Sequence, residues 1–402
     1  MSPPAEAAAD VETSAGRANE RLVSLVSHRQ TALSIALDLP TQFGYDSDDQ
    51  VVADEVGRAG VAIDTASDMC DLFAGIPLDQ VSVNFAVNAT APIILAAYLV
   101  AAERSGVAYL ALTGSLQGDV LAEFLARRAC LFPPGPALRL VTDVVEFSSR
   151  ELPRFSPISI SGSPTAGGGD PALELALAMA SAIAYCEAFH ARGLGFEAFA
   201  PRLSFRFAAA HDLVEEAAKL RAARRIWQRV ATERLGAPSP AAARLRFFSC
   251  SPASDAPLRR TPHHGAGPVG SCCVEPLADE IEARASALLA EIDALGGAVA
   301  AIEAGIAQQW MGKTGAAAEK PQDTIDEDSL AGERQAARTR ASVAARDSRA
   351  FTGALLRLAD DTRAGRNVMP ALIAAARAGT TVGEMTDVFR DAFGTFTGPA
   401  PC

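Results

Sequence analysis

The fold is decided by the stretch Ala32-Leu33-Ser34-Ile35-Ala36-Leu37-Asp38-Leu39-Pro40-Thr41-Gln42-Phe43-Gly44-Tyr45-Asp46-Ser47-Asp48. Its first part is a short apolar run of the kind that forms a buried strand, and its second part is a polar, turn-rich loop. Polar loops that directly follow strands are where α/β barrels place their ligand chemistry. The stretch therefore predicts an α/β protein with a site beside the end of this strand.

Five more strand-like segments follow before residue 250, with helical patterns between them. The predicted strands are Leu33–Leu37, Val81–Val87, Tyr109–Thr113, Ile158–Ser161, Leu203–Phe207 and Leu245–Phe248. Such βαβα alternation predicts a mostly parallel sheet with helices outside it. The spacing of roughly 30–50 residues per β/α unit favours a TIM-barrel-like (β/α) domain over a tightly wound sheet. About six strands make this barrel incomplete, so its first and last strands need a cover: the C-terminal helices, a second copy or a partner chain.

The chain divides into four predicted parts. Residues 1–18 are rich in Ala, Glu and Pro and are expected to form a flexible arm, and residues 19–250 form the barrel portion. Residues 251–270 mix Pro, Gly, His and Arg without periodicity, which is typical of a linker. Residues 271–402 are predicted to be helical, with a disordered stretch near 312–330.

Composition excludes several classes of protein. The net charge of −12 argues against a nucleic-acid or anionic membrane surface, because both need basic patches. The seven cysteines are odd in number and show no repeated CxxC, so we expect reduced thiols and neither a disulfide framework nor a metal site. We find no signal peptide and no apolar run of transmembrane length, and we expect a cytoplasmic protein.

A series of sequence blocks resembles the cobalamin-dependent acyl-CoA mutases, the family of methylmalonyl-CoA mutase. In order, the blocks are Ala36–Asp48, Gly60–Thr65, Leu72–Asp79, Val87–Pro92, Leu112–Asp119, Leu131–Pro134, Ile158–Gly162, Phe199–Phe205, Gly296-Gly297, Ala300–Ile306 and Thr381–Asp387. The resemblance implies a (β/α)8 barrel, in which the pantetheine chain of an acyl-CoA passes along the axis beside small polar side chains. It also implies radical isomerisation with adenosylcobalamin, held by a separate C-terminal domain.

The resemblance assigns five substrate-binding residues. Ser34 and Gln117 match positions that line the substrate channel, and Arg127 matches the arginine that holds the free carboxylate of a methylmalonyl-type substrate. Arg202 and Ser204 match the pair that contacts the CoA portion. The residue types suit these roles, since a guanidinium offers a planar fork of donors to carboxylate or phosphate and an amide can orient a thioester carbonyl.

The chain departs from the family pattern at the catalytic positions. Where the family continues the strand Ile158–Ser161 and its glycine with Tyr-His, this chain has Ser163-Pro164, and proline supplies no side-chain donor or titratable group. The family's catalytic tyrosine has no counterpart near Ala8–Thr13. The bridge at 251–270 is too short for two further β/α units, and its pair His263-His264 has no clustered ligands that would make a metal site. The catalytic residues are therefore unknown.

Three functions follow from this pattern. The chain is an acyl-CoA isomerase whose cobalamin-binding subunit is a separate chain, a non-catalytic subunit that pairs with a competent mutase, or an enzyme repurposed for cobalamin-independent chemistry on an acyl thioester. The Asp-x-His-x-x-Gly motif of the family's cobalamin domain does not occur, so we expect no cofactor on this chain alone and adenosylcobalamin only with a partner subunit. We expect a homo- or hetero-oligomer that binds an acyl-CoA or a related thioester and does not isomerise it alone.

Overall fold

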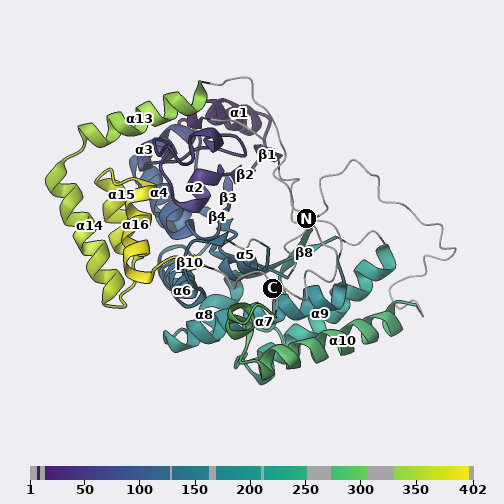
Figure 1. The fold of residues 1–402 in the computed structure, drawn as a ribbon. Helices are drawn as coiled ribbons and strands as arrows, with labels where there is room; N and C mark the ends of the chain where they lie inside the picture. The colour runs from purple at the N-terminus through teal and green to yellow at the C-terminus, as the bar shows by residue number, and fades with distance from the viewer. Residues whose placement is uncertain are drawn as a thin grey trace. The chain divides into compact units, whose positions relative to one another are not determined.

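A computed structural model gives the fold of the chain (Figure 1). It describes residues 7–9, 14–126, 129–162, 169–209, 212–250, 273–306 and 330–397. The predicted linker at 251–270 and most of the stretch near 312–330 lie outside the described residues. The chain forms two compact units. The first unit comprises Met1–Gly118, Leu131–Ile158 and Lys320–Phe396, and the second comprises Asp119–Cys130, Ser159–Glu319 and Thr397–Cys402.

The first unit is built on a parallel five-stranded sheet with the order β1-β2-β3-β4-β6. Its strands are β1 (Ala7–Ala9), β2 (Ala32–Ala36), β3 (Ser82–Ala86), β4 (Thr113–Leu116) and β6 (Phe155–Ser156). Two differences from the sequence prediction concern its strands. The arm predicted at 1–18 contains β1, which pairs with β2, so β2 is not an edge strand. The segment predicted as a strand at Tyr109–Thr113 begins as the 3-10 turn η2 (Tyr109–Ala111), and β4 follows it.

The first unit also contains the helices α1 (Ala15–Ser27), α2 (Leu39–Phe43), α3 (Ala66–Leu72), α4 (Ala91–Arg104) and α6 (Pro134–Glu151), and the 3-10 turn η1 (Ala53–Glu55). Helix α4 is buried over almost its whole length, as its nearly uninterrupted apolar sequence requires. Its Tyr98 ring meets Phe73 and Phe85 edge-on at centroid distances of 5.4 and 5.2 Å. These contacts join α3, α4 and β3 into one core.

The C-terminal helices of the first unit form an outer layer. They are α13 (Ala331–Ala345), α14 (Ser348–Arg363), α15 (Met369–Arg377) and α16 (Val382–Phe393). Helix α15 packs against α4, and α14 packs against α15 and α16 (Figure 1). The predicted packed helical layer at the C-terminus is therefore present, and it rests on a helix outside the sheet.

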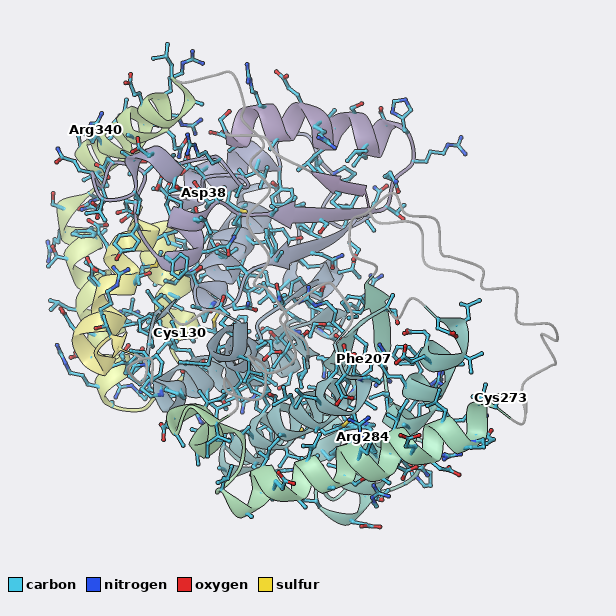
Figure 2. All side chains as sticks on the ribbon, turned by 45° about the vertical axis from the view of Figure 1, so that its right-hand side comes forward. Asp38, Cys130, Phe207, Cys273, Arg284 and Arg340 are labelled. Atoms are coloured by element: carbon cyan, nitrogen blue, oxygen red, sulfur yellow. The ribbon has the colours of Figure 1, made fainter. Side chains whose placement is uncertain are left out.

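The second unit contains a smaller sheet with the order β7-β8-β9, in which β8 and β9 are parallel. Its strands are β7 (Ile158–Ser161), β8 (Leu203–Ala208) and β9 (Phe247–Cys250), and its helices are α5 (Val120–Ala126), α7 (Pro171–Ala191), α8 (Phe196–Phe199), η3 (Ala200–Arg202), α9 (Leu213–Glu233), α10 (Val274–Ala294) and α11 (Ala298–Glu303). Two-residue strands, β5 (Ala129–Cys130) and β10 (Phe396–Thr397), complete the described elements. Phe207 of β8 belongs to the core of this unit (Figure 2).

The predicted α/β class with parallel sheets is confirmed, whereas a closed barrel is not seen among the described strands. Apart from the two-residue strands β5 and β10, the described strands are divided between two sheets. Between β6 and β7 lies only Pro157, which has no N–H to donate to a strand ladder.

Helix α7 corrects the prediction that no segment reaches transmembrane length. It is long and apolar enough to cross a bilayer, but 83% of its most apolar window is buried inside the protein. It packs against α9 and α10 and carries the buried Glu174. These contacts are those of a core helix in a folded unit.

Buried carboxylates attach the C-terminal helices to the loop after β2. Asp46 accepts hydrogen bonds from the Thr381 hydroxyl at 2.6 Å and from the Gly383 N–H at 2.7 Å, at the start of α16. A side chain at Gly383 would collide with this carboxyl group, because a Cβ there would lie 2.6 Å from Asp46 Oδ2. The loop conformation and the position of α16 therefore depend on each other.

A second carboxylate, Asp64, attaches α13 in the same way. Asp64 accepts from the Thr339 hydroxyl at 2.7 Å, from the Gln335 amide at 2.8 Å and from the Ser47 N–H at 2.7 Å. Asp38, at the end of β2 (Figure 2), caps α2 through the Thr41 N–H and also accepts from the Gly57 N–H at 2.8 Å. We call Asp38, Asp46 and Asp64 the carboxylate cluster.

Burial raises the pKa of each member of this cluster, to about 6 for Asp38 and about 7 for Asp46. The mutual repulsion of the carboxylates adds to the rise, and the hydrogen bonds oppose it. A carboxyl group with a raised pKa in the folded state binds its proton more tightly when folded. It therefore stabilises the fold at low pH, and this stability is lost as the pH rises through the folded-state pKa.

We expect the free energy of unfolding to fall between about pH 4 and pH 7, by up to about 1.4 kcal/mol per pH unit from Asp46 alone. Asp46→Asn removes the titrating group and should flatten this dependence. Urea unfolding across the pH range measures it, with Asp48→Asn as the control for loss of a charge in the same loop. An unchanged pH profile in Asp46→Asn would contradict the assignment.

Candidate functional site

A row of polar side chains crosses one face of the first unit's sheet. The register places Ser34 of β2 beside Asn84 of β3, Asn84 beside Ser115 of β4, and Ser115 beside Ser156 of β6. All four are half-buried, whereas their neighbours along the strands, such as Leu33 and Val83, are buried. This polar row arises because successive side chains of a strand point to opposite faces.

Two members of the polar row are joined by a hydrogen bond. The Ser115 hydroxyl donates to Asn84 Oδ1 at 2.5 Å. Gln117 follows β4 directly, where its N–H donates to Phe85 O at 3.0 Å and its residue is half-buried. Hydroxyl and amide groups both donate and accept, so this face can serve the amides and carbonyls of an extended polar chain. The structure thus brings the predicted residues Ser34 and Gln117 into one sheet.

The other predicted residues lie in the second unit or outside the described residues. Arg202 ends η3 and Ser204 lies two residues further on, in β8. Arg202 Nη1 donates to Ala198 O at 2.6 Å, while its Nε is buried and has no hydrogen-bond partner among the described residues. Burial lowers the pKa of this guanidinium. Arg127 lies outside the described residues, as do Ser163-Pro164 and His263-His264.

The buried pair at the start of α5 was not predicted from the sequence. Asp119 accepts from the Tyr185 hydroxyl at 2.8 Å and from the Ser161 N–H at 2.7 Å, and it caps α5 through the Ala122 N–H at 3.2 Å. Burial raises the pKa of Asp119 and of Tyr185. The capping position of Asp119 before an apolar helix was the only available signal, because Tyr185 is 66 residues away. These contacts fix α5, the helix that leads to Arg127.

The described residues do not supply an imidazole suited to a cobalt or other metal site. His190 lies with its ring nitrogens 3.0 and 3.1 Å from the carbonyl oxygens of Leu194 and Leu235. His28 Nδ1 lies 2.7 Å from Ser24 O on the surface. No cluster of three or more His, Cys, Asp or Glu side chains that could hold a metal occurs within the described part of the chain.

The fold and the polar row define a parallel α/β protein with a polar strand face, and sequence comparison gives its family. The chain matches the family described as methylmalonyl-CoA mutase over residues 8–257, 267–329 and 313–395. It belongs to the methylmalonyl-CoA mutase family. The resemblance inferred from the sequence blocks is confirmed.

Several relatives align with most of the chain. It is 33% identical to a methylmalonyl-CoA mutase of Rhizobium meliloti, over 92% of this chain and 63% of that protein. It is 31% identical to the 2-hydroxyisobutanoyl-CoA mutase large subunit of Aquincola tertiaricarbonis, over 94% of this chain and 81% of that protein. A methylmalonyl-CoA mutase large subunit of Streptomyces virginiae is 46% identical over 50% of this chain. The chain spans about six tenths of the length of the Rhizobium relative.

Proposed function

We propose that this chain binds an acyl-CoA thioester along the polar row and does not isomerise it alone. The observation that carries the proposal is the alignment of Ser34, Asn84 and Ser115 across three neighbouring strands. In a family that acts on acyl-CoA esters, such a row suits the amide groups of pantetheine. We further propose that the strands of both units belong to a barrel of TIM type, in which this face points inward.

Five residues carry the proposed binding. Ser34 lines the channel, and Gln117 orients the thioester carbonyl through its amide. Arg127 holds the free carboxylate of a malonyl-type acyl group. Arg202 and Ser204 contact the CoA portion, where the guanidinium of Arg202 offers its N–H donors to a phosphate oxygen.

The sequence supports the absence of isomerisation by this chain alone. Pro164 stands where the family has a catalytic histidine, and no tyrosine precedes Tyr45. Proline cannot donate or accept a proton, so the substrate carbonyl lacks its acid at this position. Adenosylcobalamin would supply the radical chemistry when bound, and we propose that it is available only through a partner subunit.

A partner subunit is also the basis of the second candidate function. Two relatives are named large subunits, of a 2-hydroxyisobutanoyl-CoA mutase and of a methylmalonyl-CoA mutase. Their names favour a chain that binds the thioester within a hetero-oligomer, as a non-catalytic or catalytic partner. A third candidate function is that of a repurposed enzyme that acts on an acyl thioester without cobalamin. We also propose a cytoplasmic location.

Calorimetric titration of the full chain with acetyl-CoA tests the binding site. We expect wild-type protein to bind and Arg202→Ala to bind about tenfold or more weakly, because a charge-assisted hydrogen bond to phosphate is lost. Arg104→Ala, which removes an exposed arginine at the end of α4, should bind as the wild type does. Equal affinity in Arg202→Ala and wild type would remove Arg202 from the site.

An assay of isomerisation tests the second part of the proposal. The purified chain is mixed with adenosylcobalamin and methylmalonyl-CoA, and succinyl-CoA is measured. We expect none above the background without protein, since Pro164 cannot serve as an acid. Formation of succinyl-CoA at an ordinary enzymatic rate would refute this expectation.

A further inference from the structure

We propose that helix α14 is a dimerisation surface, against which the same helix of a second copy of this chain packs in the antiparallel direction. The helix belongs to the outer layer of the first unit (Figure 1). Four exposed residues follow one line along it: Arg349, Gly353, Leu356 and Asp360. Successive residues of a helix are turned by about 100°, so these four positions fall within about 60° of one another. We call them the α14 ridge.

The α14 ridge lies opposite the side by which α14 packs inside the first unit. Leu358 and Thr362 are buried on that side, and the helix contacts α15 and α16. Leu356, on the ridge, is 62% exposed. Single exposed apolar side chains are common on protein surfaces, so this leucine alone does not define an interface. The hollow beside it distinguishes it from the others.

This hollow, of about 620 Å³, lies between α14 and α15. Five small residues contribute to its lining: Ala350, Gly353, Ala354, Ala374 and Ala378. Within the described part of the chain, a Cβ at Gly353 would meet no atom of a neighbouring element within 4 Å. The hollow therefore has room for an apolar side chain from another molecule, and its small residues let a second helix approach α14 closely.

The α14 ridge is complementary to itself. In an antiparallel pair with a two-fold axis through the midpoint of the ridge, Leu356 of each copy faces Gly353 of the other. The same arrangement places Arg349 opposite Asp360 at both ends of the interface. These two charged residues are about 16 Å apart along the helix. Neither forms an ion pair with another described residue, so both are available to a second copy.

These features favour a second copy of the chain over a different partner. An isologous interface uses the same patch on both subunits, so each feature must find its complement within that patch. The α14 ridge meets this condition twice, with an apolar side chain beside a hollow and with two opposite charges. The net charge of −12 opposes association of two copies in general, and the local pairs of opposite charge offset this repulsion at the ridge.

Sedimentation velocity of the full chain tests whether the dimer forms. We expect a weak dimer, because one helix from each copy buries less than the roughly 1,200 Å² of a standard interface. Between about 1 and 100 µM protein, the dissociation constant should be on the order of 10 µM. A chain that is fully monomeric at about 100 µM would overturn the proposal.

Two variants test the apolar contact. Gly353→Leu fills the hollow, and Leu356→Gln removes the side chain that enters it. Both positions are exposed and both new residues favour helix, so the monomer should remain folded, as circular dichroism and thermal unfolding can show. We expect each variant to weaken the dimer about tenfold or more. The control is Leu110→Gln, at a leucine that is 63% exposed outside the α14 ridge, and it should dimerise as the wild type does.

An exchange of charges tests the antiparallel arrangement. Arg349→Asp and Asp360→Arg each place like charges opposite each other, and each should weaken the dimer about fivefold. The double variant Arg349→Asp/Asp360→Arg restores the opposite charges and should bring the affinity back to within about threefold of the wild type. Arg340→Asp, which changes an exposed arginine of α13 (Figure 2), should have no effect. A double variant that dimerises no better than the single variants, or a dimer that no ridge variant weakens, would overturn the proposal.

Discussion

The register between β2, β3 and β4 is the constraint on which the rest of the structure depends. It pairs Leu33 with Val83 on one face and Ser34 with Asn84 on the other. Because the side-chain period of a strand is two, a slip of one residue would place Ser34 and Asn84 in the core and expose the apolar set. The burial of Leu33, Val83 and Phe85 in the core therefore also determines which side chains lie on the polar face.

The outer layer depends on a different interaction. Asp46 accepts hydrogen bonds from a hydroxyl and an N–H group at the start of α16. Asp64 accepts them from an amide and a hydroxyl side chain within α13. These carboxyl groups are costly to bury in their charged form, which is why their pKa values are raised. The loop after β2, which carries the sequence block most typical of the family, is therefore held by helices more than 260 residues away in the sequence. The family-like sequence of this loop therefore has a packing explanation beside a functional one.

Local sequence predicted the elements whose apolar pattern is strong. Strands β2, β3, β7 and β8 lie where they were predicted, because short apolar runs bounded by turns form buried strands. Strand β1 was missed because an alanine-rich segment has little strand propensity of its own, and pairing with β2 determines its conformation. The predicted strand at Tyr109–Thr113 was placed too early for a similar reason, since η2 precedes the residues that pair with β3.

The residues of the candidate site could be predicted only from the resemblance to the family. Gln117, Arg202 and Ser204 lie in matched blocks and Ser34 lies two residues before one, so none of them came from periodicity. Helix α9 is rich in arginine, and charges on such a helix usually form a solvated face. Only the structure shows that Arg225 and Arg229 pair with α10.

The catalytic positions of this chain depart from the family pattern, whereas one face of the strands carries a row of polar side chains. This contrast is the basis for proposing that the chain binds a thioester and does not isomerise it alone. Hydrogen–deuterium exchange of the full chain with saturating acetyl-CoA measures most directly which strands the ligand contacts. The account predicts slower exchange in Thr113–Gln117 and Leu203–Ala208, with α14 unchanged. Unchanged exchange in both strands would contradict it.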